Sequence, residues 1–325
     1  MTFPRRRFLH LAAGAAALPA LSRAAFAQAY PSRPIRWIVA GAPGNTTDII
    51  ARLIGQWLTE RLGQPVVIEN RPGAGSNIGT EAAVRAAPDG YTLLLIGSPQ
   101  VINVTLYDKL GFNLVRDIAP VASVSVTPNV MEVNPQFPAK TVPEFIAYAK
   151  ANPGKINFGS PGIGTSIHIS GELFKMLTGV DMVHVPYRAT QTALTDLMSG
   201  QIQVMFDNMP TSIGFIKDGK LRPLAVTSAT RWEGLPEVPA LADFVPGFEA
   251  SGFGGVGVPA GTPGEIIERL NREINAALAD PKISARFAEL GTSVYALSPA
   301  DYGKLLAAEV EKWGKVVKFS GAKAE

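Results

Sequence analysis

Strand-like and helix-like segments alternate through the first third of this chain, and that order restricts the fold more than any other feature of the sequence. An apolar run at 35–40 precedes a segment with helical periodicity at 46–62. The same pair recurs at 66–70 and 78–86, and a third apolar run follows at 92–96. Neighbouring parallel strands need a long crossover, which is usually a helix. The order therefore predicts a parallel sheet with helices on both faces.

A long apolar stretch at 121–133, broken at Pro128, interrupts this alternation before it resumes. We then expect helices at 142–151, 165–177 and 194–198, and strands at 156–159, 182–185, 204–207 and 224–227. A second long apolar piece, 252–258, leads to three final helical segments, of which 263–279 is the best defined. This organisation predicts an α/β clamshell, in which two lobes with mostly parallel sheets are joined by two crossing strands.

The first 27 residues have the features of an export signal. A twin-arginine pattern, RRRFL, occupies 5–9, and the apolar run at 9–21 is shorter than the ~20 residues that span a bilayer. Ala25-Phe26-Ala27 matches the small-x-small site of a signal peptidase. We predict a twin-arginine signal peptide over 1–27, cleaved near Ala27, and a periplasmic protein. Pro4 stands where such signals have Ser or Thr, so general secretion stays open.

The chain that remains after cleavage has almost no net charge. The full sequence has 30 Lys plus Arg against 27 Asp plus Glu, a formal charge of +3. Four of the arginines lie in the predicted signal, so 26 basic residues remain and the net charge becomes −1. Nucleic-acid binding requires a basic footprint, so we expect no nucleic-acid partner. The absence of cysteine excludes disulfides, thiolate metal sites and a cysteine nucleophile.

The length of the mature chain suits two lobes around two cores. The two long crossings place the expected boundaries. Lobe 1 is predicted to comprise 28–127 together with 252–325, and lobe 2 is predicted to comprise 128–251.

One local pattern occurs twice, once in each predicted lobe. APGNTTD at 42–48 follows the first expected strand, and SPGIGTS at 160–166 follows the strand at 156–159. Pro and Gly fix a tight turn that lets the backbone approach a ligand, and hydroxyl-bearing residues then begin a helix. Free N–H groups and the helix dipole at that position favour an anion such as a carboxylate. The two turns therefore predict a carboxylate site that uses amides, hydroxyls and water, without Lys or Arg.

Other interpretations of these residues stay open. A purely structural one is that four of them only cap helices: Asn45, Thr46, Thr165 and Ser166. His168 and His184 are the histidines beyond the predicted signal, and their spacing matches no metal motif. No G-x-S-x-G nucleophile motif is present, so we expect neither a catalytic nor a metal site. Asp207 ends an apolar strand, where its carboxylate could select a ligand group or cap the next turn.

Five short motifs carry a family resemblance. They are YPSRPI at 30–35, VIENRPGAGSNIG at 67–79, PDGYT at 88–92, HVPY at 184–187 and PAGTP at 259–263. With them the chain resembles the Bug-type (Bordetella uptake gene) extracytoplasmic solute receptors of tripartite tricarboxylate transporters over essentially its whole mature length. The resemblance implies a periplasmic-binding-protein type II clamshell with no catalysis and no cofactor. It also implies delivery of a small organic carboxylate to the membrane permease subunits of such a transporter.

The resemblance further implies which positions bind the ligand. In the family the two turns hold one carboxylate, partly through water, and the matching positions here are Ala42, Gly44, Asn45, Thr46, Ser160, Gly164 and Thr165. Ser98, after the third strand, and Asp207 would line the variable part. Asn45 replaces a second glycine in the first turn, and Ala189 replaces a glycine after the HVPY motif. Both departures affect the identity of the ligand more than the fold.

Two other functions share these sequence features. A ligand-occupied protein that signals to a two-component system would have the same signal peptide and the same turns. An exported hydrolase would have to convert its bound ligand. Aromatic, dicarboxylic and amino acids are all compatible with the predicted site, and we expect a monomer.

Overall fold

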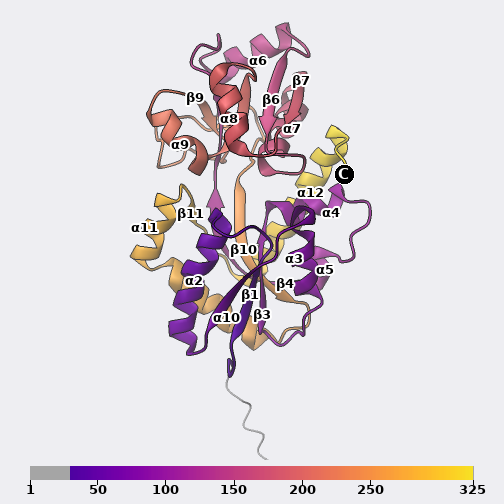
Figure 1. Cartoon of the computed structure of the whole chain (residues 1–325), viewed down its shortest axis with the longest axis vertical. Coiled ribbons are helices and arrows are strands. Elements are labelled where there is room, and N and C mark those ends of the chain that lie inside the picture. Colours follow the sequence, from indigo (N-terminus) through magenta and orange to yellow (C-terminus); the bar gives the residue numbers. More distant parts are fainter. Residues whose placement is uncertain (1–29, 325) are drawn as a thin grey trace, which may run out of the picture. The chain divides into compact units, whose positions relative to one another are not determined.

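The computed structural model describes residues 30–324, so the predicted signal peptide lies outside the described residues. The chain divides into a short N-terminal unit, Met1–Ser32, and a compact unit, Arg33–Glu325. The described helices and strands all lie in the second unit, where they form two sheets with their own helices (Figure 1). Within residues 30–324, no helix is long and apolar enough to cross a membrane.

The first lobe is built on a six-stranded sheet. Its strand order is β11-β4-β10-β3-β1-β2, with β1 Ile35–Val39, β2 Val66–Asn70, β3 Thr92–Gly97, β4 Ile118–Thr127, β10 Gly252–Pro259 and β11 Ser293–Val294. The helices of this lobe are α2 Thr46–Leu62, α3 Asn77–Val84, α4 Ser98–Leu106, α5 Leu114–Asp117, α10 Gly264–Leu278, α11 Pro281–Glu289 and α12 Pro299–Ser320, with a short 3₁₀ turn at Ala74–Ser76.

The second lobe is built on a five-stranded sheet. Its strand order is β7-β6-β8-β5-β9, with β5 Asn129–Val133, β6 Ile156–Ser160, β7 Met182–Pro186, β8 Val204–Asn208 and β9 Arg222–Val226. Its helices are α6 Val142–Ala151, α7 Ser166–Thr178, α8 Thr190–Ser199 and α9 Met209–Lys217, and a 3₁₀ turn lies at Leu241–Asp243.

Both sheets are mixed, which corrects the expectation of mostly parallel sheets. The strands that follow helical crossovers pair in parallel, as β1 does with β2 and β3, and as β6 does with β7 and β8. The strands that enter from the other lobe or return directly pair antiparallel: β10 with β3 and β4, β11 with β4, and β5 with β8 and β9. A crossing strand carries the chain between sheets without a helical return, so nothing forces it to run parallel.

The first crossing between the sheets is short. β4 ends at Thr127 in the first sheet and β5 begins at Asn129 in the second, so a single residue, Pro128, separates them. The return crossing enters β10, whose glycines allow close neighbours. A Cβ atom on Gly255 would lie 2.8 Å from the carbonyl oxygen of Ala122, nearer than real Cβ contacts. This lack of side chains lets β10 insert between β3 and β4.

The largest hydrophobic cluster includes buried residues of both lobes. Leu94 and Ile96 on β3 belong to it, and so do Phe158 on β6 and Phe206 on β8. Helix α12 connects the two parts, because it packs against α4 in the first lobe and α7 in the second (Figure 1). Its Trp313 is buried. The lobes are therefore joined by packing on the α12 side as well as by the crossing strands.

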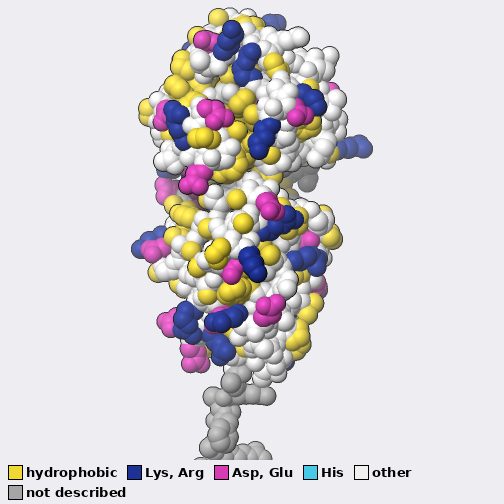
Figure 2. Space-filling model, turned by 90° about the vertical axis from the view of Figure 1, so that its left-hand side faces the viewer, with side chains coloured by type: hydrophobic (Ala, Val, Ile, Leu, Met, Phe, Trp, Pro, Cys, Tyr) yellow, Lys and Arg dark blue, Asp and Glu magenta, His cyan; other side chains and the backbone are white. Residues whose placement is uncertain are grey.

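The surface has no strong charge bias on the face shown in Figure 2. Lys and Arg side chains are interspersed there with Asp and Glu over both lobes. This distribution agrees with the near-zero formal charge of residues 28–325.

Candidate functional site

A cavity of about 270 Å³ lies between the two lobes, at the ends of strands from both sheets. We call it the interlobe cavity. Its wall consists of Thr46, Thr47, Ile50, Gly97, Ser98, Pro99, Ser125, Thr127, Pro161, Thr165, Ser166, Ile167, Asn208, Pro210, Gly252 and Phe253. Among these residues there is no Lys, Arg, His, Asp or Glu. The polar groups of the wall are therefore hydroxyls, one side-chain amide and backbone groups.

Four helices begin at this wall. The first residues of α2 and α4 are Thr46 and Ser98, and α7 begins at Ser166. The N-cap of α9, Asn208, also lies on the wall. The first N–H groups of a helix have no partner within the helix, and the helix dipole places about half a positive charge there. Four such ends give an uncharged wall a positive potential, which suits an anion.

The two Pro-Gly turns have matching hydrogen bonds. In the first turn, residues 42–48, Gly44 has φ +81° and its N–H donates to Asp48 Oδ2 at 2.9 Å. In the second turn, residues 160–166, Gly164 has φ +80° and its N–H donates to His168 Nδ1 at 3.3 Å. Each glycine adopts a left-handed conformation that other residues disfavour. Each also has its N–H occupied by the side chain four residues later.

The cap residues of these turns are occupied in the same way. Asn45 Oδ1 accepts the N–H of Asp48 at 2.8 Å, and Thr165 Oγ1 accepts the N–H of His168 at 3.3 Å. Thr165 Oγ1 also donates to the carbonyl of Gly162 at 2.8 Å. The groups left for a ligand are therefore the N–H groups of residues 46, 47, 166 and 167, at the first two positions of α2 and α7.

The turns differ in charge. Burial opposes ionisation of Asp48 in the first turn, but Arg52, the Gly44 N–H and Asn70 together lower its pKa. Arg52 Nε lies 3.0 Å from Asp48 Oδ2, and Asn70 Nδ2 donates to Oδ1 at 2.9 Å. The matching side chain in the second turn is His168, and burial lowers its pKa to about 3, helped by His184 and Lys175. The first turn thus has an ion pair behind it, and the second has a neutral imidazole.

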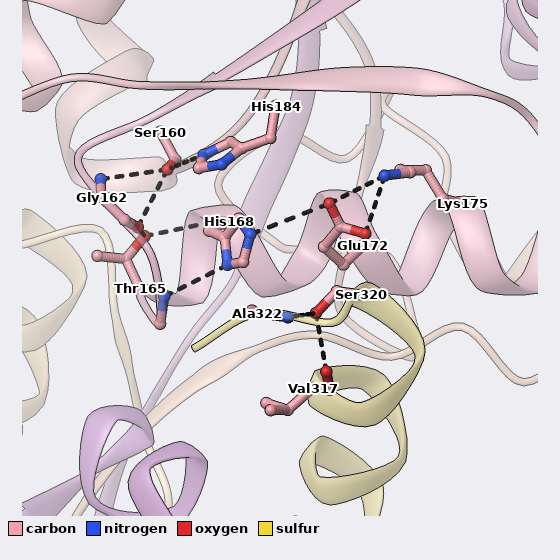
Figure 3. Close-up of polar contacts among 11 residues, drawn as sticks. Ser160, Gly162, Thr165, His168, Glu172, Lys175, His184, Val317, Ser320 and Ala322 are labelled. Carbon is pink, nitrogen blue, oxygen red and sulfur yellow. Dashed lines mark hydrogen bonds and ion pairs between the residues drawn. The ribbon is translucent and has the colours of Figure 1, made fainter. Parts of the chain in front are cut away.

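A buried polar network supports the second turn (Figure 3). Ser160 is fully buried, and its Oγ lies 2.7 Å from His184 Nε2. The ring centroids of His168 and His184 are 4.2 Å apart. Burial lowers the pKa of His184 to about 4. Ser160 and His184 have the spacing of a serine–histidine pair, but a fully buried hydroxyl cannot reach a substrate. Within the described residues, no group of three or more His, Asp or Glu could hold a metal ion.

The structure brings some of the predicted site residues together and separates others. Thr46, Ser98 and Thr165 lie on the wall of the interlobe cavity. Asn45 lines a neighbouring cavity of about 200 Å³, which shares Thr47, Gly97 and Pro99 with the first. The other predicted residues are absent from the wall: Ala42, Gly44 and Gly164 belong to the turns, and Ser160 and Asp207 are fully buried.

Several wall residues were not predicted from the sequence. Thr47, Ser125, Thr127, Ser166, Asn208 and Phe253 are the clearest of these. Ser125, Thr127 and Phe253 lie on the crossing strands, which the sequence analysis used only as connections. Asn208 and Pro210 belong to the start of α9, a helix that was not expected. A proline at the second position of a helix is a sequence signal for its start, and Pro99 in α4 and Pro210 in α9 both occupy that position.

Comparison with known proteins gives consistent matches. Residues 50–321 match the profile of the TctC family, described as tripartite tricarboxylate transporter family receptor. Protein BugT of Bordetella pertussis is 38% identical over 300 residues, which cover 91% of this chain and 92% of BugT. A solved periplasmic transporter is 40% identical with a TM-score of 0.77, covering 91% of this chain and 100% of that one.

A second solved structure contains a ligand. R. palustris Rpa4515 with adipate is 35% identical to this chain, with a TM-score of 0.77, covering 90% of this chain and 99% of that one. These matches and the strand order β2-β1-β3-β10-β4 confirm the predicted type II periplasmic-binding-protein fold with two α/β lobes.

Proposed function

This chain belongs to the TctC family of tripartite tricarboxylate transporter receptors, which bind solutes and are not enzymes, and we propose that it captures a small organic carboxylate in the interlobe cavity. It then delivers the carboxylate to the permease subunits of a tripartite tricarboxylate transporter. The family membership agrees with the resemblance seen in the sequence motifs. The chain works in the periplasm in this proposal, after removal of the segment 1–27.

The observation that carries the proposal is the uncharged wall with four helix N-termini. A carboxylate there can accept hydrogen bonds from backbone N–H groups of both lobes, so a single bound anion holds the lobes together. Ile50, Ile167 and Phe253 supply apolar surface for the carbon skeleton of the ligand. The relative Rpa4515, solved with adipate, makes a dicarboxylate a reasonable first ligand to test.

The roles of the predicted residues follow from their positions. Thr46 and Ser98 lie on the wall of the cavity, and their hydroxyls make no hydrogen bond to other described residues. Ala42, Gly44, Asn45, Ser160, Gly164 and Thr165 shape the two turns that aim the helix amides at the ligand. Asp207 is buried behind the wall, so in this proposal it influences the cavity without touching the ligand. We assign the lobes to 28–127 with 252–325 and to 128–251, and we propose hinge closure at the crossing strands.

A thermal-shift screen of ligand-free protein with mono- and dicarboxylates tests this function. Ligand at 100 times its dissociation constant should stabilise the protein by about 2.7 kcal/mol. A neutral sugar and an amine of similar size serve as controls, and neither should shift the melting temperature. No shift with any carboxylate, on protein shown to be free of ligand, contradicts the proposal. Chemical conversion of the bound carboxylate would point instead to a hydrolase.

A further inference from the structure

Two acids are completely buried in the second lobe, behind the wall of the interlobe cavity. They are Glu132 on β5 and Asp207 on β8, and both have an exposed fraction of 0%. The two strands are antiparallel neighbours, with Val130 opposite Asp207 and Glu132 opposite Met205, so both acids point to the same face of the sheet. Helix α9 packs on this face through Ser212, whose hydroxyl contacts both carboxyls.

Hydrogen bonds around this pair need more protons than the hydroxyls supply. Ser212 Oγ lies 2.6 Å from Glu132 Oε1 and 2.8 Å from Asp207 Oδ2. Thr211 Oγ1 lies 2.5 Å from Asp207 Oδ2 and 2.8 Å from the carbonyl oxygen of Asn208. Each of these four contacts between oxygens requires a proton, and each hydroxyl has one. The carboxyls must supply the rest.

One arrangement satisfies every contact. Protonated Glu132 donates to Ser212, Ser212 donates to Asp207, protonated Asp207 donates to Thr211, and Thr211 donates to the carbonyl of Asn208. This chain runs from a buried acid to a residue on the cavity wall. If Asp207 is ionised, Thr211 has to divide its single proton between two acceptors. The geometry therefore favours carboxyl protons at this position.

Burial favours protonation of both acids. It raises the pKa of Glu132 well above its usual value, and the charge of Asp207 adds to this effect. It also raises the pKa of Asp207 to about 6, although hydrogen bonds from Thr211 and Ser212 oppose the shift. Asp207 is thus a member of the pair that changes its charge near neutral pH, and burial favours the protonated form of Glu132.

Other charged groups on the surrounding elements are engaged elsewhere. Arg222 on β9 donates to the carbonyl oxygens of Pro135 and Phe137, Asp196 on α8 accepts from the hydroxyl of Tyr187, and Lys217 lies at the far end of α9. Arg231, Glu233 and Glu237 of the loop after β9 are exposed. Helix α7, with His168, Glu172 and Lys175, covers the other face of the sheet, where Ser170 contacts Asn129.

The charge of Asp207 bears directly on the cavity. Asp207 precedes the N-cap of α9, Asn208, which lies on the wall with Pro210. An ionised carboxylate at this position cancels the partial positive charge of the helix end, and a proton restores it. We propose that Glu132 and Asp207 form a proton-binding site that sets the affinity of the interlobe cavity for its anionic ligand. Protonation of Asp207 strengthens binding, and by linkage the bound ligand raises the proton affinity of Asp207.

This inference rests on the proposed function, because it needs a carboxylate in the cavity. The dissociation constant should rise with pH through the range in which Asp207 loses its proton, by at most about tenfold per pH unit for one proton. His168 and His184 do not contribute above pH 5.5, because their pKa values are lowered to about 3 and about 4. A monocarboxylic acid such as benzoic acid is ionised throughout that range, so a pH profile measured with benzoate reports on the protein.

The test is calorimetric titration with adipate, malate and benzoate from pH 5.5 to 8.0. For the native protein, the dissociation constant of the best of these ligands should increase at least threefold over this range. Asp207→Asn should abolish the pH dependence and bind at pH 8.0 about as tightly as the native protein binds at pH 5.5. Glu132→Gln should keep the dependence, because its amide can donate to Ser212 as the protonated acid does.

Two further variants serve as a second test and a control. Ser212→Ala removes a donor that stabilises ionised Asp207, so the midpoint of the profile should move to higher pH even if Asp207→Asn does not fold. Glu309→Gln changes another buried acid, on α12, and should keep the native profile. If the dissociation constant of Asp207→Asn varies with pH as that of the native protein does, the proton-binding inference is wrong but the proposed function stands. The same holds if the native dissociation constant does not depend on pH. No binding of any of the three ligands at any pH overturns the proposed function as well.

Discussion

Thr46→Val removes one hydroxyl from the cavity and keeps the shape of the side chain. Thr46 is the first residue of α2 and lies on the wall, and its hydroxyl makes no hydrogen bond to the described part of the chain. A hydrogen bond to a charged group contributes about 1.5–3 kcal/mol. The loss of one such bond to a ligand carboxylate should weaken binding about 10- to 150-fold. Stability should change by less than about 0.5 kcal/mol, because no contact within the protein is lost.

Thr165→Val, at the N-cap of α7 in the second turn, should behave differently. Its hydroxyl caps α7 and donates to Gly162, so it holds the turn rather than the ligand. Loss of an N-cap costs about 1 kcal/mol of stability. A protein of this size should then melt about 2–4 °C lower. Affinity should fall as well, but only through disorder of the turn.

Calorimetric titration with the carboxylate that gives the largest thermal shift, together with melting curves, separates the two effects. Thr195→Val is the matched control, because Thr195 is an exposed threonine on α8 whose hydroxyl donates to the carbonyl of Gln191. It should change neither affinity nor ligand-induced stabilisation. Unchanged affinity in Thr46→Val would refute the assignment of this hydroxyl to the ligand. Equal losses of stability in Thr46→Val and Thr165→Val would refute the distinction between the two roles.

Three other predictions concern the second turn and the histidines behind it. Gly164→Ala should lower the melting temperature, because Gly164 has φ +80° and an added Cβ would collide with Leu106. Gly214→Ala is the control and should not lower it, because nothing lies within 4 Å of a Cβ at that position. Equal melting temperatures of the two variants would contradict this prediction. His168 and His184 should show no imidazole titration by NMR between pH 8 and 5, and a pKa near 6.5 for either would disprove their burial as neutral rings. Because the unfolded chain takes up these protons below pH 6.5 and the folded chain does not, the two histidines reduce the free energy of unfolding as the pH falls from 6.5 toward 4, by at most about 1.4 kcal/mol per histidine and pH unit. His184→Gln should remove part of this slope in denaturation experiments.

Local sequence signals determine the elements that were predicted correctly. The observed bounds of α2 and α6, Thr46–Leu62 and Val142–Ala151, equal the predicted ones. In both helices a capping residue marks the start, Asn45 and Thr141, and Gly63 ends α2 in a left-handed conformation. These signals act within a few residues, so a sequence is sufficient to detect them.

The helices α4 and α9 were missed because each follows a strand without a loop. β3 ends at Gly97 and α4 begins at Ser98, while β8 ends at Asn208 and α9 begins at Met209. No loop separates the strand from the helix at either junction, and a proline at the second helical position, Pro99 or Pro210, is the local sign of each start. Both helices contribute their N-termini to the cavity, so half of the positive ends at the site were absent from the sequence-based prediction.

The position of Asp207 depended on tertiary structure. It was predicted to line the cavity because it ends a strand that should reach the site. Its side chain instead points into the sheet face that α9 covers, and its exposed fraction is 0%. That direction follows from the register of β8 against β5, a pairing between segments about seventy residues apart, which periodicity along one strand does not reveal.

A structure of the protein with a bound carboxylate tests the central claim most directly. We predict that the carboxylate oxygens lie within hydrogen-bond distance, about 2.7–3.2 Å, of N–H groups at residues 46, 47, 166 and 167 or of waters bound to them. We also predict that no Lys or Arg touches the ligand. A carboxylate bound outside the interlobe cavity, or held there by a cationic side chain, would contradict the proposed mode of binding.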